Sequence, residues 1–327
     1  MRRSALLAAA LVMAALGSSA VAQEKYPSKP IRIITAFAPG SATDIIARLL
    51  AEQLKQVVGQ NVVVENKPGA FGIVAIEEMA RSRPDGHTVM IGNVSTSAIT
   101  PLLYPKKFSI DYEKSVVPVS RVGVLPNFFV VTTKGLPVNT LPEFIAYAKQ
   151  WPGKVKYSSS GVGSFPHYDT EILAWRAGIE MVHIPIKEGP PVIIRDMLTG
   201  DIQASFMNVA TSAALVRSGQ LKPLAVVTEE RLPEYPDVPT MKELGFPGVG
   251  TPLWSMMFAP AGTPNDVLVT LHAAVTKALN SDALKESYKK QLITPTPTAS
   301  LNETTAWLRD EMAKWSKIMS EVKIEIE

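Results

Sequence analysis

The residues best suited to chemistry are hydroxyl and glycine residues in two loops that each precede a predicted helix. In residues 37–44, Ser41 is a candidate N-cap, and Asp44 follows three residues later as in a capping box. Residues 158–167 place serines and two glycines before Pro166, which is tolerated in a first helical turn. Unpaired N–H groups at a helix start carry partial positive charge and attract anions. The loops therefore predict an anion-binding site, although capping alone would also explain Ser41 and Asp44.

A third loop, residues 185–191, also leads from a strand into a helix, with prolines in the first turn. Its Lys187 and Glu188 either face the ligand or lie on a solvated rim, and the rim is the simpler interpretation. Because neither of the first two loops contains Arg or Lys, a carboxylate would be held by N–H dipoles, hydroxyls and ordered water. One helix start contributes at most about 2 kcal/mol, whereas micromolar binding needs about 8 kcal/mol. We therefore expect two parts of the protein to close over the anion and supply the rest.

Catalysis has little support in the sequence. Ser164, His167 and Asp169 lie too close together in the chain to form a nucleophile–base–orienter line, and no G-x-S-x-G motif is present. The four histidines include no H-x-x-x-H pair, and the absence of cysteine excludes disulfides, thiolate metal sites and a cysteine nucleophile. The second loop, residues 158–167, matches neither of the nucleotide-binding motifs G-x-G-x-x-G and G-x-x-x-x-G-K-[ST]. We expect no catalytic residue, no metal and no cofactor, with an exported hydrolase as the remote alternative.

Alternating strand and helix patterns position these loops. Strands rich in β-branched residues are predicted at 31–37, 61–65, 88–91, 155–158, 181–186, 202–207 and 224–227. Helices with apolar residues at helical spacing are predicted at 45–57, 72–81, 166–177 and 190–198. The alternation predicts an α/β protein with parallel sheets joined by right-handed crossovers, arranged in two similar halves.

Two apolar stretches are predicted to connect the halves. Residues 117–131 would cross from one to the other, and residues 254–259 would return. The C-terminal helices, expected to pack back on the first half, are at 265–280, 281–291 and 301–322. The predicted division is lobe 1 from residues 23–123 plus 253–327, and lobe 2 from residues 124–252. A ligand cleft is expected between the lobes.

The N-terminus resembles a secretory signal peptide. Arg2 and Arg3 precede an apolar run from Ala5 to Gly17, and Ala20-Val21-Ala22 provides an A-x-A cleavage site. The run is shorter than the roughly 20 residues of a membrane span, so a retained anchor is the less favoured alternative. We expect export through the Sec pathway, cleavage after Ala22 and a periplasmic location.

Composition excludes other classes of protein. The 327 residues are 46% hydrophobic and 19% charged, which is typical of a globular chain and not of a disordered one. A formal net charge of +3 is too small for a typical nucleic-acid binder. The expected partners therefore do not include nucleic acid.

Ordered motifs along the mature chain resemble the substrate-binding proteins of tripartite tricarboxylate transporters, the Bug family. The matching segments are Tyr26–Arg32, Phe37–Asp44, Val64–Ala70, Pro84–Thr88, Tyr157–Ser164, His183–Pro185, Gly189-Pro190 and Pro236–Thr240. The resemblance implies a two-lobed periplasmic-binding-protein fold of the Venus-flytrap type II class. It also implies a small organic-acid ligand (a di- or tricarboxylate or an aromatic carboxylate), delivery to integral-membrane permease subunits of a secondary transporter, and a monomer. A receptor that presents its closed form to a membrane signalling partner is the alternative.

The resemblance also implies which residues contact the ligand. Carried onto this sequence, these are Ala38, Pro39, Ser41 and Ala70 in lobe 1, and Ser160, Gly161, Ser164 and His167 in lobe 2. Ser95 and Asn208 are added because each lies near a predicted strand end. The position of His167 in a first helical turn favours its neutral form, whereas His87 and His183 are expected to serve the structure.

The first loop departs from the family pattern, because Ala38-Pro39 and Gly40-Ser41 replace its double proline and double glycine. Phe71 stands where the family usually has a small glycine. If Phe71 faces the cleft, an aromatic or long apolar ligand is favoured over citrate. A core or surface role for this aromatic ring is the alternative.

Overall fold

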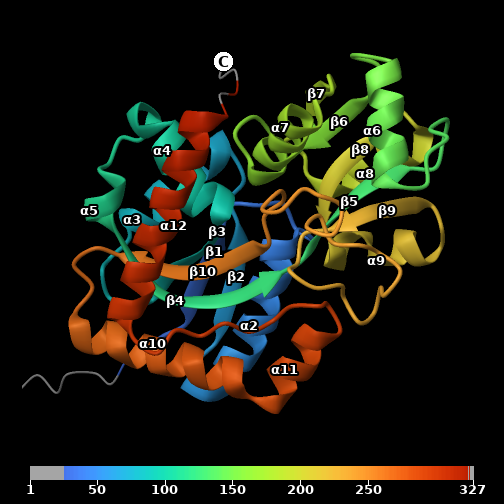
Figure 1. Ribbon diagram of the computed structural model, residues 1–327. Coiled ribbons are helices and arrows are strands. Elements are labelled where there is room, and N and C mark those ends of the chain that lie inside the picture. The colour runs from blue at the N-terminus through green and yellow to red at the C-terminus, as the bar shows by residue number, and fades with distance from the viewer. Residues whose placement is uncertain (1–25, 323, 325–327) are drawn as a thin grey trace, which may run out of the picture.

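The computed structural model describes residues 26–322 and 324, so the predicted signal peptide lies outside the described residues. Figure 1 shows two α/β lobes side by side, each built around its own sheet. Within the described part of the chain, no helix combines the length and apolar character needed to cross a bilayer. The predicted α/β class with two lobes is confirmed.

The sheet of lobe 1 has the strand order β2-β1-β3-β10-β4. Its strands are β1 (Ile31–Thr35), β2 (Val62–Asn66), β3 (Thr88–Asn93), β4 (Val116–Leu125) and β10 (Leu253–Pro260). Strand β1 pairs in parallel with β2 and β3, as predicted. The sheet as a whole is mixed, because the crossing strand β10 runs antiparallel to β3 and β4. The reason is connectivity: β4 leaves lobe 1 at the junction, so the returning β10 must start there and run the other way.

The sheet of lobe 2 repeats this arrangement in the order β7-β6-β8-β5-β9. Its strands are β5 (Asn127–Thr132), β6 (Lys156–Ser159), β7 (Val182–Pro185), β8 (Ala204–Asn208) and β9 (Leu221–Val226). Strand β5, which begins at the junction, is antiparallel to both neighbours. The single strand predicted over residues 117–131 is therefore two strands. Pro126 separates them, because proline has no N–H for a ladder hydrogen bond.

Helices cover both sheets (Figure 1). Lobe 1 carries α2 (Ala42–Val58), α3 (Ile73–Ala80), α10 (Asn265–Asn280), α11 (Asp282–Lys289) and α12 (Leu301–Glu321). Its short helical segments are η1 (Ala70–Gly72), η2 (Ser95–Ile99), α4 (Thr100–Leu103), η3 (Pro105–Lys107) and α5 (Tyr112–Ser115). Lobe 2 carries α6 (Leu141–Gln150), α7 (Phe165–Ala177), α8 (Pro190–Thr199) and α9 (Val209–Arg217). Contacts of α12 with β4, and of α10 and α11 with α2, confirm that the C-terminal helices pack on the first lobe.

The first turn of α7 joins the two lobes. Although α7 follows a strand of lobe 2, its Phe165 and Tyr168 belong to the hydrophobic core of lobe 1. Tyr168 is 1% exposed, and its ring lies edge-on to that of Trp315 in α12, with 5.8 Å between ring centroids. The lobes are thus packed against each other, and separating them would expose these two aromatic rings to water.

Candidate ligand-binding site between the lobes

A cavity of about 390 Å³ lies between the lobes, within the size range of pockets for small ligands. Lobe 1 supplies the start of α2, the η1 turn and the end of β3. Lobe 2 supplies the loop before α7, the loop before α8 and the end of β8. Parallel strands carry these loops at their carboxyl ends, where ligands of α/β sheets bind. Residues 38–41 and 160–164 therefore contribute to one hollow, as the predicted site required.

The structure brings most of the candidate site residues to this cavity. Those that line it are Ala38, Ser41, Ala70, Phe71, Ser95, Ser160, Ser164 and Asn208. The other three, Pro39, Gly161 and His167, are not part of its lining. Pro39 is exposed, and the Gly161 carbonyl is bound by the Ser164 hydroxyl at 2.8 Å. The Nδ1 atom of His167 accepts a hydrogen bond from the Gly163 N–H, so its ring shapes the loop from behind.

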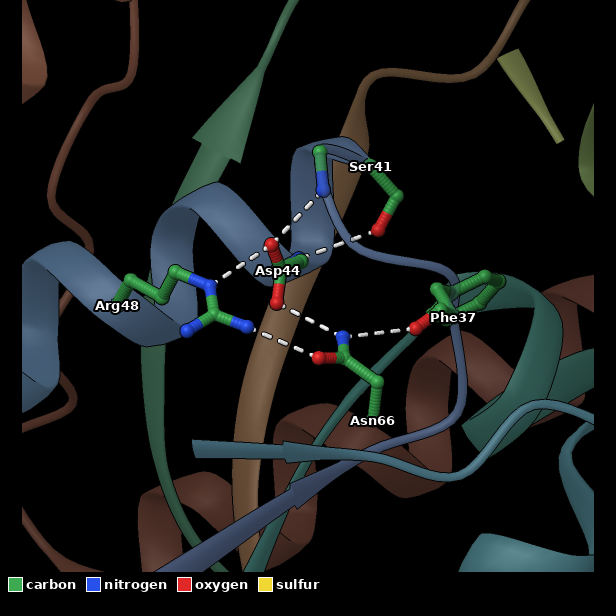
Figure 2. A network of polar contacts seen from close by, with 6 residues as sticks. Phe37, Ser41, Asp44, Arg48 and Asn66 are labelled. Carbon is green, nitrogen blue, oxygen red and sulfur yellow. Dashed lines mark hydrogen bonds and ion pairs between the residues drawn. The ribbon is translucent and has the colours of Figure 1, made fainter. Parts of the chain in front are cut away.

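A polar network fixes the start of α2 (Figure 2). The Asp44 carboxylate accepts hydrogen bonds from the Gly40 N–H at 2.9 Å, Arg48 Nε at 3.0 Å and Asn66 Nδ2 at 2.8 Å. Asn66 also donates to the Phe37 carbonyl, which ties β2 to the loop. Burial raises the pKa of Asp44, but these hydrogen bonds outweigh it and hold the pKa below its usual value. The Asp44 carboxylate is therefore ionised at neutral pH, and its hydrogen bonds hold the start of α2 in place.

The first N–H groups of α2 belong to residues that line the cavity. The Ser41 side chain caps the helix by accepting from the Asp44 N–H, and the Ile45 N–H bonds to the Ser41 carbonyl. In the hydrogen bonds of the described chain, the N–H groups of Ala42 and Thr43 have no acceptor, and both residues line the cavity. Thr43 Oγ1 accepts from Asn93 Nδ2 at 2.9 Å, which leaves the hydroxyl proton for another acceptor. Two backbone donors and one hydroxyl on cavity-lining residues are thus without an acceptor in the described chain.

The sequence analysis predicted that helix-start N–H groups of both loops would hold one anion, but the helix starts of lobe 2 offer few such groups. The Phe165 N–H at the start of α7 already donates to Ser95 Oγ of lobe 1 at 3.1 Å, and Pro166 has no N–H. The first two residues of α8 are Pro190 and Pro191, which also lack N–H groups. The α7 start therefore bonds the two lobes together, and the helix-start N–H groups left without an acceptor at the cavity are those of α2 described above.

Phe71, which lines the cavity, forms an aromatic pair with Tyr104, which does not. The Phe71 ring stacks on Tyr104 with 4.6 Å between centroids, and Lys107 Nζ lies 4.3 Å from the Tyr104 centroid. Lys187 of lobe 2 reaches to 5.8 Å from the Phe71 ring. The interpretation that Lys187 and Glu188 lie only on the rim needs correction, because both exposed residues also line the cavity. The Lys187 ammonium group therefore lies near Phe71, at the same end of the cavity.

Sequence reasoning missed several lining residues. They are Thr43, Thr100, Phe165, Ile193, Phe206, Met207, Thr211 and Leu253, together with Asn93 and Thr96, of whose strand end only Ser95 was a candidate residue. Asn93 is 2% exposed and its Oδ1 accepts from the Ser95 N–H, so it orients both lobe-1 loops. Its position at the carboxyl end of a parallel strand was the signal that could have identified it.

A second polar network runs through the junction between the lobes. Asn208 Nδ2 donates to Asn127 Oδ1 at 2.5 Å, and Asn127 in turn donates to the Thr251 carbonyl. The Asp169 carboxyl accepts from both the N–H and the hydroxyl of Thr251, each at 2.8 Å. Burial raises the pKa of Asp169 to about 7, against the lowering effect of those hydrogen bonds. The network connects a cavity residue, Asn208, with both chain crossings.

The fold and the cavity define the class of two-lobed solute-binding proteins. The chain belongs to the tripartite tricarboxylate transporter receptor family, whose model, described as "Tripartite tricarboxylate transporter family receptor", matches residues 46–324. This confirms the resemblance to Bug proteins, a family of periplasmic solute-binding receptors.

Individual relatives agree with this assignment. Protein BugT of Bordetella pertussis is 34% identical over 301 residues, covering 92% of this chain and 91% of BugT. The solved structure of Rhodopseudomonas palustris Rpa4515 with adipate has 31% identity and a TM-score of 0.84, covering 90% of this chain and 97% of that one. MatC from the same organism, with bound malate, has 26% identity and a TM-score of 0.81, covering 90% of this chain and 99% of that one.

Proposed function

We propose that this protein captures a small organic acid between its lobes and delivers it to a tripartite tricarboxylate-type membrane transporter. The observation that carries the proposal is the pair of N–H groups of Ala42 and Thr43, two cavity-lining residues, which have no acceptor in the described chain. A carboxylate would satisfy both N–H groups and the partial positive charge of the helix start. Adipate and malate in related receptors support the same ligand class.

The rest of the cavity favours an acid with an apolar body. Apolar side chains supply much of the wall: Phe71, Phe165, Ile193, Phe206, Met207 and Leu253. Lys187 near Phe71 is suited to a second carboxylate, and the Phe71 ring is suited to an aromatic or methylene chain. The proposed ligands are therefore a dicarboxylate with a linking chain or an aromatic carboxylate.

A thermal-stability screen tests this function. Mono-, di- and tricarboxylates and aromatic acids are added at 1 mM, and the unfolding temperature is compared with that of the ligand-free protein. A ligand at 100 times its Kd adds about 2.7 kcal/mol to stability, which is readily measured. We expect at least one dicarboxylate or aromatic acid to raise the unfolding temperature without being consumed. No shift across the series would contradict the receptor proposal, and turnover of a hit would favour the hydrolase.

Replacement of Phe71 by glycine tests the aromatic selection. Phe71 has φ 58° and ψ 24°, a left-handed conformation that glycine adopts more easily, so the backbone should keep its shape. We expect Phe71→Gly to weaken an aromatic carboxylate about tenfold, from the lost ring contact, and an aliphatic one less. Calorimetric titration of both ligands provides the measurement. Equal losses would show that Phe71 does not select the ligand.

The chain crossings at Pro126 and Pro252 suggest where the lobes divide. We propose lobe 1 at residues 23–123 plus 253–327 and lobe 2 at residues 124–252; the sheets support this division to within two residues, since β4 of lobe 1 extends to Leu125. Removal of residues 1–22 on export and action as a monomer belong to the same proposal. A mass measurement of the exported protein and light scattering would check both.

A further inference from the structure

We propose that His167 and His183 form a stacked, uncharged pair that positions the loop of residues 159–164 for ligand binding. The proposal rests on the proposed function, because Ser160 and Ser164 of this loop line the proposed ligand cavity. Both histidines lie behind the loop and neither lines the cavity. They would act through the loop and not by touching the ligand.

The two rings are stacked, with His167 buried and His183 partly buried. Their centroids lie 3.8 Å apart with an angle of 14° between the ring planes. The His183 ring also lies nearly parallel to Tyr157, with 4.9 Å between centroids, and Tyr157 and His167 are 6.2 Å apart. The residue His167 is only 5% exposed. The three rings thus form a cluster between strands β6 and β7 and the first turn of α7.

Each imidazole is bonded to the loop. The Gly163 N–H donates to His167 Nδ1 at 3.1 Å, and His183 Nε2 lies 2.7 Å from Ser159 Oγ. Ser159 Oγ also donates to the Gly161 carbonyl at 2.9 Å and accepts from the Gly161 N–H at 3.2 Å. A Ser159 hydroxyl that donates its proton to that carbonyl accepts from a protonated Nε2 of His183. Both ends of the loop are therefore fixed by a histidine.

The loop needs this support because its backbone is unusual. Gly161 has φ +119° and Gly163 has φ +78°, and a Cβ on Gly163 would lie 2.3 Å from Leu103 Cδ2 of lobe 1. Glycine has many alternative conformations, so two glycines in a short loop make one conformation costly to hold. The histidine hydrogen bonds select the conformation that fits against lobe 1.

The pair can do this only while neutral. A protonated His167 would present N–H to the Gly163 N–H, and two charged rings 3.8 Å apart would repel each other. Burial lowers the pKa of His167 to about 3, helped by His183, and burial lowers the pKa of His183 to about 4.

The surrounding titratable groups do not offset this preference. They are Tyr157 of β6, whose hydroxyl bonds to Glu171, Tyr168 of α7, and Tyr104 near Gly163. Burial raises the pKa of each of these tyrosines, so they too are neutral at physiological pH.

Two substitutions of His167 separate positioning from simple packing. His167→Asn retains an acceptor close to the Nδ1 position, whereas His167→Phe retains a stacked ring without an acceptor. The probe is adipate or malate, whichever gives the larger thermal shift with the wild type. We expect His167→Phe to raise the Kd about tenfold or more and His167→Asn to raise it less than about threefold. His272→Phe is the matched control, since His272 bonds to the Thr298 carbonyl away from the loop.

Equal affinity of His167→Phe and the wild type, or an equal loss in both His167 variants, would overturn the proposal. A ligand-independent experiment covers the case in which the phenylalanine variant does not fold. In the wild type, the NMR signal of the Gly163 amide should shift with the titration of His167, while the amides near His87 and His272 do not. A Gly163 signal that is insensitive to His167 titration would also overturn the proposal.

The same NMR titration with the probe present gives a second readout. Binding should lower the apparent pKa of His167, because the ligand-bound loop requires its Nδ1 as an acceptor. An unchanged value in a protein that binds the probe would count against the histidine pair. Absence of binding by either acid, with the Gly163 response intact, would count against the proposed function instead.

Discussion

The Ala42→Pro variant is expected to fold like the wild type and to bind its carboxylate ten- to a hundredfold more weakly. Ala42 is the first residue of α2, a position where proline is tolerated because its N–H has no intrahelical partner. The preceding Ser41 has φ −68° and ψ 158°, an extended conformation compatible with a following proline. The substitution therefore removes one proposed ligand donor and leaves the helix intact. A charge-assisted hydrogen bond contributes about 1.5–3 kcal/mol, which sets the size of the loss.

Ala42→Gly is the matched control, because it shortens the side chain but retains the N–H. Calorimetric titration of both variants with the best ligand from the screen gives the Kd values, and circular dichroism checks the fold. Wild-type affinity in Ala42→Pro, or an equal loss in Ala42→Gly, would show that this N–H does not hold the ligand.

Replacing Asp169 should have the largest effect on stability. In Asp169→Ala, the buried N–H and hydroxyl of Thr251 would lose their acceptor at the junction of the lobes. We expect the free energy of unfolding to fall by roughly 2–4 kcal/mol, since unsatisfied buried donors cost about 1–3 kcal/mol each. Asp169→Asn should be tolerated, because its carbonyl can accept from the Thr251 N–H and its amide can donate to Thr251 Oγ1. Urea unfolding of both variants at pH 8 measures the difference.

The pKa of Asp169 predicts how the stability difference between Asp169→Asn and the wild type changes with pH. Because burial raises the pKa of Asp169 to about 7, the folded protein binds this proton more tightly than the unfolded chain does. The contribution of Asp169 to stability therefore decreases as pH rises from about 4 to 7. Relative to the wild type, Asp169→Asn should gain stability over that range and be at least as stable at pH 8. A loss at pH 8 as large as that of Asp169→Ala would show that the ionised carboxylate is required.

Much of the fold could be predicted because local patterns and tertiary structure agree. The helix spacing from Ile45 to Val57, the closing Gly59 and the capping Ser41 all reappear in α2, where Gly59 is left-handed. The first of the three C-terminal helices, residues 265–280, was predicted with its observed bounds. The direction of β10 could not be predicted, since strand direction depends on how the chain returns from the other lobe and not on local sequence.

The candidate site was predictable in position but not in detail. Positions near strand ends identified Ser95 and Asn208, and the family resemblance identified Ser41 and Ser160; all four line the cavity. The sequence could not show that the first N–H of α7 bonds to lobe 1 instead of remaining available to a ligand. This hydrogen bond, from the Phe165 N–H to Ser95 Oγ, joins residues of different lobes. His167 was assigned to the ligand from its loop, whereas its stacking on His183 depends on the packing of β7 beside β6.

A crystal structure with adipate or malate bound would test the central claim most directly. The prediction is a carboxylate whose oxygens lie about 2.7–3.1 Å from the backbone nitrogens of Ala42 and Thr43, as for charge-assisted hydrogen bonds. A ligand held only by Lys187, with water at the start of α2, would contradict it.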